Sequence, residues 1–239
     1  MRCQIMAAMA AIALFFSGTL RADEFQYVDW TAANPGNGTA SGIITLPDMS
    51  TVNVDFEVLN FDGSPGNYFF AQTTPDTNYW IPSAPYISAE VENAPPTTDI
   101  LALVGGSNQT YKITLSEPIK DPIMAIVSLG QPGVQVDYDF DRPFSIVSQG
   151  TGYWGGGPAS LSQQPGDILR GFEGHGTIRF NGTFNTFSWT APLGESWHGF
   201  TYGIRTTEAI EPTIPEPTTF VHFAIGCCAM TTAAWRRRD

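Results

Sequence analysis

Cysteine is missing from the central part of the chain. The three cysteines among the 239 residues are Cys3, Cys227 and Cys228, and each lies in an apolar segment near one end. Residues 23–211, called the body below, therefore have no structural disulfide, no cysteine nucleophile and no zinc site built from thiolates. A body of this length buries enough surface to be stable without such cross-links.

Basic residues are also scarce. The chain has 11 Lys and Arg against 23 Asp and Glu, a formal net charge of −12, and only 14% of its residues are charged, where about 25% is usual. Because five basic residues lie in the end segments, the body has six basic residues against 21 acidic ones and a formal charge near −15. Nucleic acid is not an expected partner, since phosphate binding needs a basic face. An acidic surface suits divalent cations and disfavours anionic polysaccharide unless a metal bridges the two.

The chain carries no known catalytic signature. It contains neither Gly-x-Ser-x-Gly nor His-Glu-x-x-His. The body has two histidines, His175 and His198; His198 could form an acid–base pair with Glu195, but a structural role is the simpler interpretation. Scattered Asp and Glu residues could also form a glycosidase pair. We therefore predict a protein that is not an enzyme, with a secreted glycoside hydrolase as the remote alternative.

The body shows the alternation of half-buried β-strands. In residues 51–58 four apolar side chains alternate with polar ones, and the same pattern recurs in four further segments, at 111–115, 134–140, 187–189 and 200–204. Two apolar runs, 100–104 and 123–127, fit strands that are covered on both faces. Turn signals rich in the 24 Gly and 18 Pro separate these segments, and no 11-residue window free of them keeps a helical period. Ten to twelve short strands predict an all-β fold, a single antiparallel β-sandwich or jelly-roll domain over residues 23–205.

The first 22 residues have the composition of a secretory signal. Arg2 precedes an apolar run at 5–16, and Ala22 offers a small residue before Asp23. We expect a signal helix that is removed on export, with a retained N-terminal anchor as the alternative.

The other end has three features in order. Pro215, Glu216 and Pro217 follow a spacer at 206–214, and a segment of mostly apolar or small residues covers 218–235. This segment has the length of a short transmembrane helix. The arginines that end it would stay in the cytoplasm, so the body would lie outside. An ordinary C-terminal membrane anchor is the alternative.

This tail, residues 215–239, resembles the PEP-CTERM sorting signal of Gram-negative bacteria. The resemblance is carried by Pro215-Glu216-Pro217, by the short apolar span and by the cluster of Arg236, Arg237 and Arg238. It implies processing by an exosortase, a membrane protease, during a transient stay in the inner membrane. It also implies a cell-surface or extracellular destination in the matrix of an exopolysaccharide producer. The body segments at 99–106, 111–129 and 195–204 look like those of domains that commonly precede this tail, which implies a β-sandwich of unknown ligand.

Two groups of body residues are candidates for ligand binding. Tyr79, Trp80, Tyr153 and Trp154 stand in segments rich in turn residues, where aromatic rings can stack on sugar rings; packing under loops is the alternative. Asp137, Asp139 and Asp141 lie at every second position of a predicted strand, where a Ca²⁺ ion could relieve their mutual repulsion; a solvated polar face is the alternative.

These observations predict a non-enzymatic exported protein of the cell surface or extracellular matrix. The alternative is a lectin-like carbohydrate-binding module, with or without Ca²⁺, whose partner is an extracellular polysaccharide. We expect no other cofactor.

Overall fold

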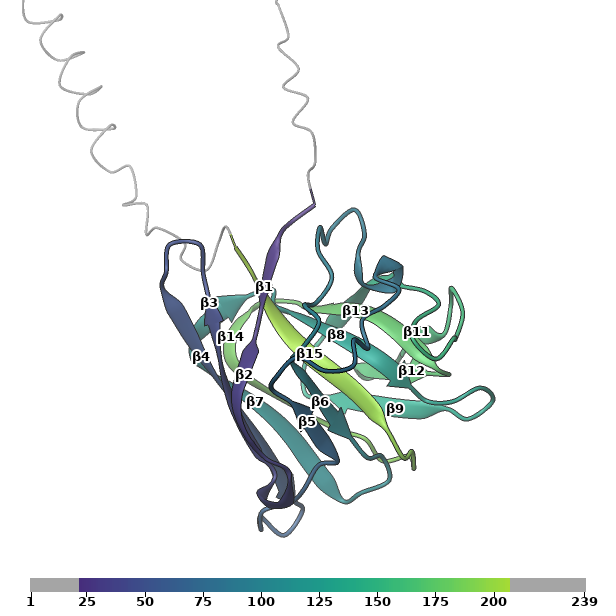
Figure 1. Ribbon diagram of the computed structural model, residues 1–239. Coiled ribbons are helices and arrows are strands. Elements are labelled where there is room, and N and C mark those ends of the chain that lie inside the picture. Colours follow the sequence, from purple (N-terminus) through teal and green to yellow (C-terminus); the bar gives the residue numbers. More distant parts are fainter. Residues whose placement is uncertain (1–21, 207–239) are drawn as a thin grey trace, which may run out of the picture. The chain divides into compact units, whose positions relative to one another are not determined.

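A computed structural model of the chain describes residues 22–206 (Figure 1). This part contains fifteen strands and two short 3-10 helices, η1 (Pro35–Asn37) and η2 (Ala84–Tyr86). The all-β prediction is confirmed. Residues 22–206 include no helix with the length and apolar character that crossing a bilayer requires. The predicted signal helix and the predicted membrane segment at 218–235 lie outside the described residues.

The strands form two antiparallel sheets, as a β-sandwich requires. The seven-stranded sheet has the order β10 (Phe144–Gln149), β13 (Gly174–Phe180), β8 (Ile123–Leu129), β15 (His198–Arg205), β6 (Ile100–Leu103) and β5 (Phe70–Gln72), and β1 (Phe25–Tyr27) pairs with β15. The eight-stranded sheet has the order β11 (Leu161–Gln164), β12 (Ile168–Gly171), β9 (Val136–Phe140), β14 (Thr183–Thr190), β7 (Gln109–Lys120), β4 (Thr51–Asn60), β3 (Thr39–Thr45) and β2 (Asp29–Asn34).

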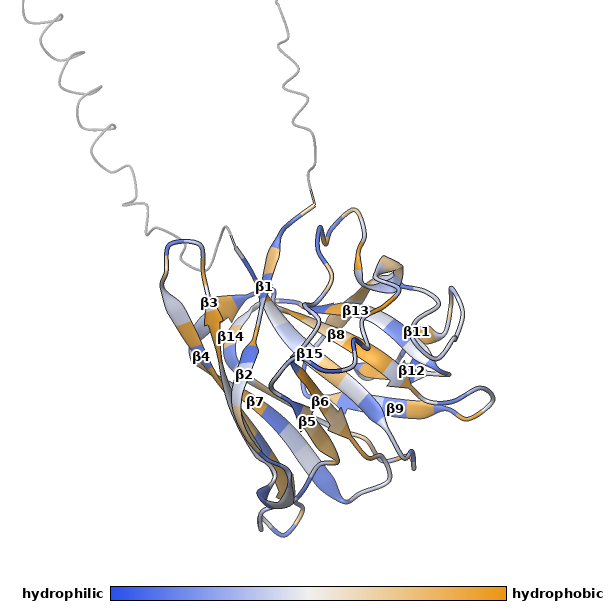
Figure 2. Ribbon diagram, viewed as in Figure 1, coloured by the Kyte–Doolittle hydropathy of each residue, from blue (hydrophilic) through white to orange (hydrophobic). Residues whose placement is uncertain are grey.

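The main core lies between the inner faces of the two sheets. On β4 the side chains of Val52, Val54, Phe56 and Val58 are buried, as the alternation predicts, while the side chains between them face outward. Figure 2 shows the same alternation of hydrophobic and hydrophilic residues along β4 and β7. Trp189 of β14 is buried in this core, in contact with Phe56 at 6.2 Å between ring centroids.

A second, smaller core covers the outer face of the seven-stranded sheet. The long connection at 73–99, between β5 and β6, crosses this face and contains η2 (Figure 1). Its buried side chains pack on outward-facing side chains of the sheet; the cluster includes Trp80, Tyr86 and Val91 with Ile123, Ala125 and Val127. This cover explains why every residue of β6 and β8 is buried, which confirms the prediction for 100–104 and 123–127 except at the exposed Val104.

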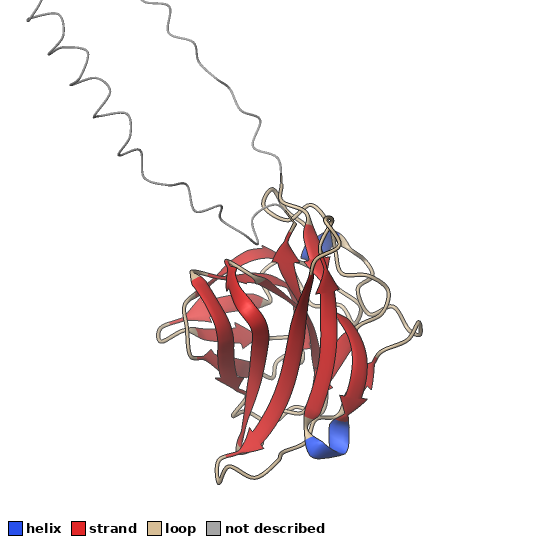
Figure 3. Cartoon of the chain, turned by 90° about the vertical axis from the view of Figure 1, so that its left-hand side faces the viewer, coloured by secondary structure: helices blue, strands red, loops and turns tan. Residues whose placement is uncertain are grey.

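The outer face of the eight-stranded sheet is open over β3 and β4. Figure 3 looks onto the side of the molecule where these strands lie, and no connection runs across them. The outer faces of the two sheets therefore differ. The eight-stranded sheet is exposed to solvent over β3 and β4, whereas the 73–99 connection covers the seven-stranded sheet.

The predicted strand at 134–140 begins two residues later than expected. Gln131 and Val134 exchange backbone hydrogen bonds of 2.9 Å around a turn at Pro132 and Gly133, where Gly133 has a φ of 80°. Val134 is therefore an exposed turn residue, and β9 begins at Val136.

Candidate functional site

Four aromatic side chains from three separate connections meet at one place. Tyr79 follows β5, Tyr153 and Trp154 lie between β10 and β11, and Trp197 directly precedes β15. The Tyr79 ring lies 5.2–5.4 Å from the rings of the other three residues, measured between centroids, and the Trp154 and Trp197 rings lie 4.6 Å apart. Tyr153 is 39% exposed and Trp154 is 45% exposed. We call these four residues the aromatic cluster.

Glycines hold the connection that carries Tyr153 and Trp154. Gly152 and Gly155 exchange two backbone hydrogen bonds, of 2.7 and 3.1 Å, so the two aromatic residues form the tip of a tight turn. A Cβ on Gly152 would stand 2.2 Å from the ring of the buried His175, and a Cβ on Gly156 would stand 2.2 Å from the carbonyl oxygen of Glu173. The sequence Gly152–Gly156 therefore lets the turn lie directly on the end of the seven-stranded sheet.

A cleft of about 330 Å³ opens beside the aromatic cluster. Trp154 and Trp197 line it, together with Ser128, Gln131, Glu173, Glu195 and Ser196. These residues come from the end of β8 and the segments that enter β13 and β15, which are neighbours in the seven-stranded sheet. Since neighbouring strands run antiparallel, all three reach the same end of the sheet.

An irregularity in β8 turns Ser128 toward Glu173. The register between β8 and β13 shifts by one residue, and Ser128 takes a left-handed φ of 60° there. Its Oγ donates a hydrogen bond of 2.6 Å to Glu173 Oε1, and its N–H donates one of 3.4 Å to His175 Nδ1. His175 Nε2 lies 3.4 Å from the same Oε1 atom. Glu173 also has a φ of 60°, so the structure holds both partners in an uncommon backbone conformation.

Glu195 is fixed on the other side of the cleft. Its Oε2 accepts a hydrogen bond of 2.8 Å from the N–H of Gly130 and lies 2.9 Å from Nδ1 of the buried His198. The predicted pairing of Glu195 with His198 is thus present. The other carboxylate oxygen of Glu195, Oε1, is buried and has no hydrogen-bond partner within residues 22–206. Tyr138 packs edge-on against the His198 ring. Burial raises the pKa of the Tyr138 hydroxyl, and the Tyr111 hydroxyl and the charge of Glu195 raise this pKa further by smaller amounts.

The structure changes the predicted set of stacking residues. It brings Tyr79, Tyr153 and Trp154 together, but Trp80 is 1% exposed and packs edge-on against Tyr86 in the second core. Trp80 therefore has no face free for a sugar, and this part of the prediction is wrong. Trp197 takes its place. Its position two residues after Glu195 and three residues before the strand predicted at 200–204 was the signal in the sequence that could have identified it.

The three aspartates proposed for Ca²⁺ have different environments. Asp137 is nearly buried and accepts two hydrogen bonds, of 2.9 and 2.8 Å, from the Arg170 guanidinium. Asp139 and Asp141 both line a shallow depression of about 280 Å³ on the eight-stranded sheet, and Asp141 contacts Arg142 and Ser188. Among residues 22–206, no group of three or more His, Cys, Asp or Glu side chains is arranged to hold a metal ion. The calcium site stays a prediction.

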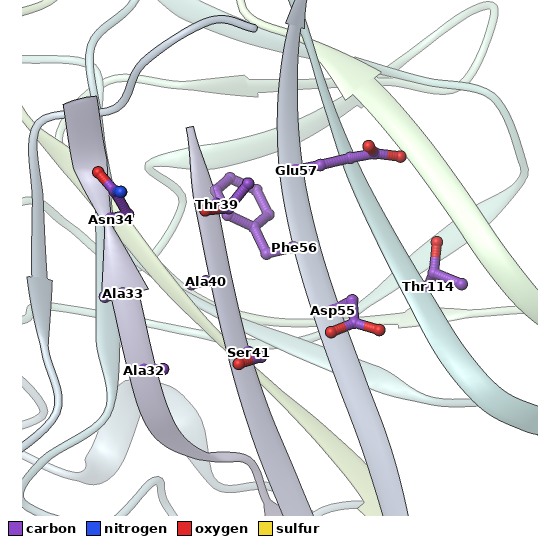
Figure 4. A pocket seen from close by; sticks show the side chains of 10 residues that line it. All are labelled: Ala32, Ala33, Asn34, Thr39, Ala40, Ser41, Asp55, Phe56, Glu57 and Thr114. Atoms are coloured by element: carbon purple, nitrogen blue, oxygen red, sulfur yellow. The ribbon is translucent and has the colours of Figure 1, made fainter. Parts of the chain in front are cut away.

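A larger depression of about 560 Å³ lies on β2, β3, β4 and β7 (Figure 4). Ser41, Asp55 and Thr114 occupy paired positions of three adjacent strands there, and Glu57 lies in the next row, where its carboxylate binds Lys112 at 2.5 Å. These polar side chains lie on the open face of the sheet. The described residues that line this depression offer no exposed aromatic ring, because Phe56 points into the core. We therefore regard the cleft beside the aromatic cluster as the candidate binding site.

The predicted sorting residues Pro215, Glu216, Pro217 and Arg236–Arg238 lie outside the described residues. Comparisons with protein families, with curated proteins and with solved structures found no match to this chain.

Proposed function

We propose that this chain is a non-enzymatic, exported surface protein whose body binds polysaccharide at the cleft beside the aromatic cluster. One observation carries the proposal: Tyr79, Tyr153, Trp154 and Trp197 converge from three connections and leave Trp154 nearly half exposed. The apolar C–H face of a sugar ring stacks on such rings. The serine and glutamine side chains that line the cleft can hydrogen-bond sugar hydroxyls.

The tail supports the exported location. A Pro-Glu-Pro motif, an apolar span and an arginine cluster stand in that order after the body, and a signal-like segment precedes it. On this proposal a signal helix and a short membrane helix flank a jelly-roll-like body. An exosortase at the inner membrane processes the tail, and the body then reaches the cell surface or the extracellular matrix.

The cleft also gives the hydrolase alternative a specific basis. Two glutamates, Glu173 and Glu195, line the same cleft, as a glycosidase would require. However, their side chains are only 8% and 1% exposed, and each is held by hydrogen bonds from the protein. A reacting carboxylate must touch the substrate. This burial favours a supporting role beneath the cleft, which is why we propose binding without catalysis.

Replacing Trp154 with alanine tests the proposal. We expect Trp154→Ala to weaken binding to a responsive polysaccharide by about 5-fold or more, because a stacked ring contributes about 1 kcal/mol or more. Affinity electrophoresis against a panel of soluble polysaccharides measures this, with Phe61→Ala as the control for an exposed ring outside the cluster. Equal retardation of wild type and Trp154→Ala in every gel would contradict the binding site. New reducing ends, released by wild type but not by Glu173→Gln, would establish the hydrolase instead.

A further inference from the structure

The cleft beside the aromatic cluster is acidic, and the residues among 22–206 that line it include no basic side chain. Two glutamates line it, and its remaining residues are two serines, a glutamine and two tryptophans. We infer that the sugar it selects is an amino sugar with a free, protonated amine, taken in preference to neutral sugars and to uronates. This inference rests on the proposed polysaccharide binding and specifies the class of ligand.

The exposed rings attract a cation. The face of an indole ring carries negative charge from its π electrons, and tryptophan is the strongest such acceptor among the aromatic side chains. Trp154 is 45% exposed, and Trp197 lies beside it with the two rings at 71° to each other. An ammonium group next to these faces gains a cation–π contact in addition to the stacking that any sugar makes.

The buried carboxylates add to this attraction. Glu195 Oε1 has no hydrogen-bond partner in the described part of the chain, and the Glu195 side chain is buried, so its charge is poorly screened by water. Within residues 22–206, the groups able to carry positive charge that contact these two carboxylates are the fully buried His175, 3.4 Å from Glu173, and His198, 2.9 Å from Glu195. A positive group in the cleft would therefore be the first to face both glutamates from the solvent side.

The same charges disfavour an acidic sugar. A uronate in this cleft would place a third carboxylate near Glu173 and Glu195, and the described lining residues include no arginine or lysine to pair with it. The body as a whole has six basic residues against 21 acidic ones, so its overall charge works in the same direction. A neutral sugar has no charge, so the glutamates neither attract it as they attract an ammonium group nor repel it as they repel a uronate.

The experiment compares three hexasaccharide probes by isothermal titration calorimetry with the full-length protein. The probes are β-1,4-linked glucosamine, β-1,4-linked N-acetylglucosamine and α-1,4-linked galacturonate, at about pH 6 and low salt, where the amine is protonated and the uronate ionised. We expect the glucosamine probe to bind about 10-fold more tightly than the acetylated probe, and the galacturonate probe not to bind.

Conservative variants assign the preference to this cleft. Glu173→Gln keeps an acceptor for the Ser128 hydroxyl, and Glu195→Gln keeps one for the Gly130 N–H, so both variants preserve the local hydrogen bonds. We expect the double variant to reduce the ratio of the two affinities to about 2-fold or less. Asp139→Asn removes the same charge from the other sheet and should leave the ratio unchanged. A circular dichroism melt of each variant confirms that it is folded.

The outcomes separate this inference from the proposed function. Tighter or equal binding of the acetylated probe, with loss in Trp154→Ala, would overturn the amino-sugar preference and keep the carbohydrate site. A preference that persists in the double glutamine variant, or that Asp139→Asn also removes, would overturn the assignment to this cleft. Binding of no saccharide, here and in the polysaccharide panel, would overturn the proposed function itself.

Discussion

At the scale of single residues, Asp99 shows how burial and charge oppose each other. Its side chain is nearly buried, and Oδ1 accepts a hydrogen bond of 2.9 Å from the N–H of Trp30, a residue of the main core. Its Oδ2 accepts one of 2.5 Å from the Thr98 hydroxyl. Burial raises the pKa of Asp99 above its ordinary value, and the charge of Asp29 adds to this, although the two hydrogen bonds act in the opposite direction. The ionised form is therefore destabilised in the folded protein.

This environment predicts that Asp99→Asn stabilises the protein at neutral pH. A carboxyl whose pKa is higher in the folded state favours folding while it is protonated, and this contribution is lost as the pH rises from its ordinary value through the folded one. Asparagine keeps the acceptor for Trp30 and tolerates the φ of 70° at this position. We expect a higher melting temperature than wild type at about pH 7, with the difference closing near about pH 3, where both side chains are uncharged.

The control for this prediction is Asp48, an aspartate whose pKa is shifted in the opposite direction. Asp48 is fully exposed, and hydrogen bonds from the Ser50 hydroxyl and N–H lower its pKa. Asp48→Asn should therefore leave stability at about pH 7 unchanged or slightly reduced. Thermal melts between about pH 3 and 8 measure both variants. A lower melting temperature for Asp99→Asn at neutral pH, or a difference that does not change with pH, would contradict the argument.

The aromatic cluster shows what could be predicted from the sequence at this scale. Tyr79 and Trp80 are adjacent, so only one of them can readily face solvent while the other faces the protein. The sequence marks both as candidates, but which one is buried depends on how the 73–99 connection lies on the sheet, and this is set by contacts with β8 that are distant in the chain. The contact between Trp154 and Trp197 also joins residues that are distant in the chain, and for that reason Trp197 was not identified as a stacking residue from the sequence.

At the scale of elements, alternation predicted the strands whose two faces meet different environments. Residues 51–58 and 111–115 lie in β4 and β7, between the core and solvent, and their patterns were correctly interpreted. β13 was missed, because Gly174, Gly176 and His175 give it no alternation and both of its faces are covered. Its glycines are needed for close packing: a Cβ on Gly174 would stand 2.2 Å from the Leu161 side chain.

The turn that carries Tyr153 and Trp154 yields the prediction at this scale. Gly152→Ala places a methyl group 2.2 Å from the ring of His175, which is fully buried and held by Ser128 and Tyr86. We expect a loss of about 1–3 kcal/mol in the free energy of unfolding, because an overpacked site must shift. Urea denaturation measures the loss, and affinity electrophoresis should show weaker saccharide binding, since the same shift moves Trp154.

Gly157→Ala is the matched control for this turn. Gly157 follows the same turn, and a Cβ there would meet no atom of residues 22–206 within 4 Å. Its substitution should change the free energy of unfolding by less than about 0.5 kcal/mol. Similar unfolding curves for Gly152→Ala and Gly157→Ala would show that the close contact with His175 does not fix the turn.

At the scale of the whole molecule, the two sheets have different exposed surfaces. Composition and turn spacing predicted the all-β class, but they contain no information about which sheet face a long connection covers. The cleft lies where β8 ends and β13 and β15 begin, and the covering connection contributes Tyr79 to the aromatic cluster beside it. The open face of the eight-stranded sheet remains polar, with side chains such as Asp55 and Thr114.

The tail yields the prediction that belongs to the whole chain. If residues 215–239 are a sorting signal, a protease must recognise Pro215-Glu216-Pro217 and remove the apolar span, so the mature protein is shorter than the exported precursor. An ordinary anchor needs only the apolar span and the arginines after it. Replacing the three motif residues with alanine therefore separates the two mechanisms, because it leaves the apolar span and the charge of the arginine cluster unchanged.

We expect the triple alanine variant to accumulate in the inner membrane as the longer form, while wild type yields the shorter form at the cell surface or in the medium. Immunoblots of cell fractions with an antibody against the body measure the size and location of each form. The body should fold equally well in both, because its two cores are formed by residues 22–206. Wild type and variant bands of equal length, both in the membrane fraction, would identify the tail as a simple anchor. Full-length protein in the cytosol would remove the basis for an extracellular polysaccharide as the partner of the cleft.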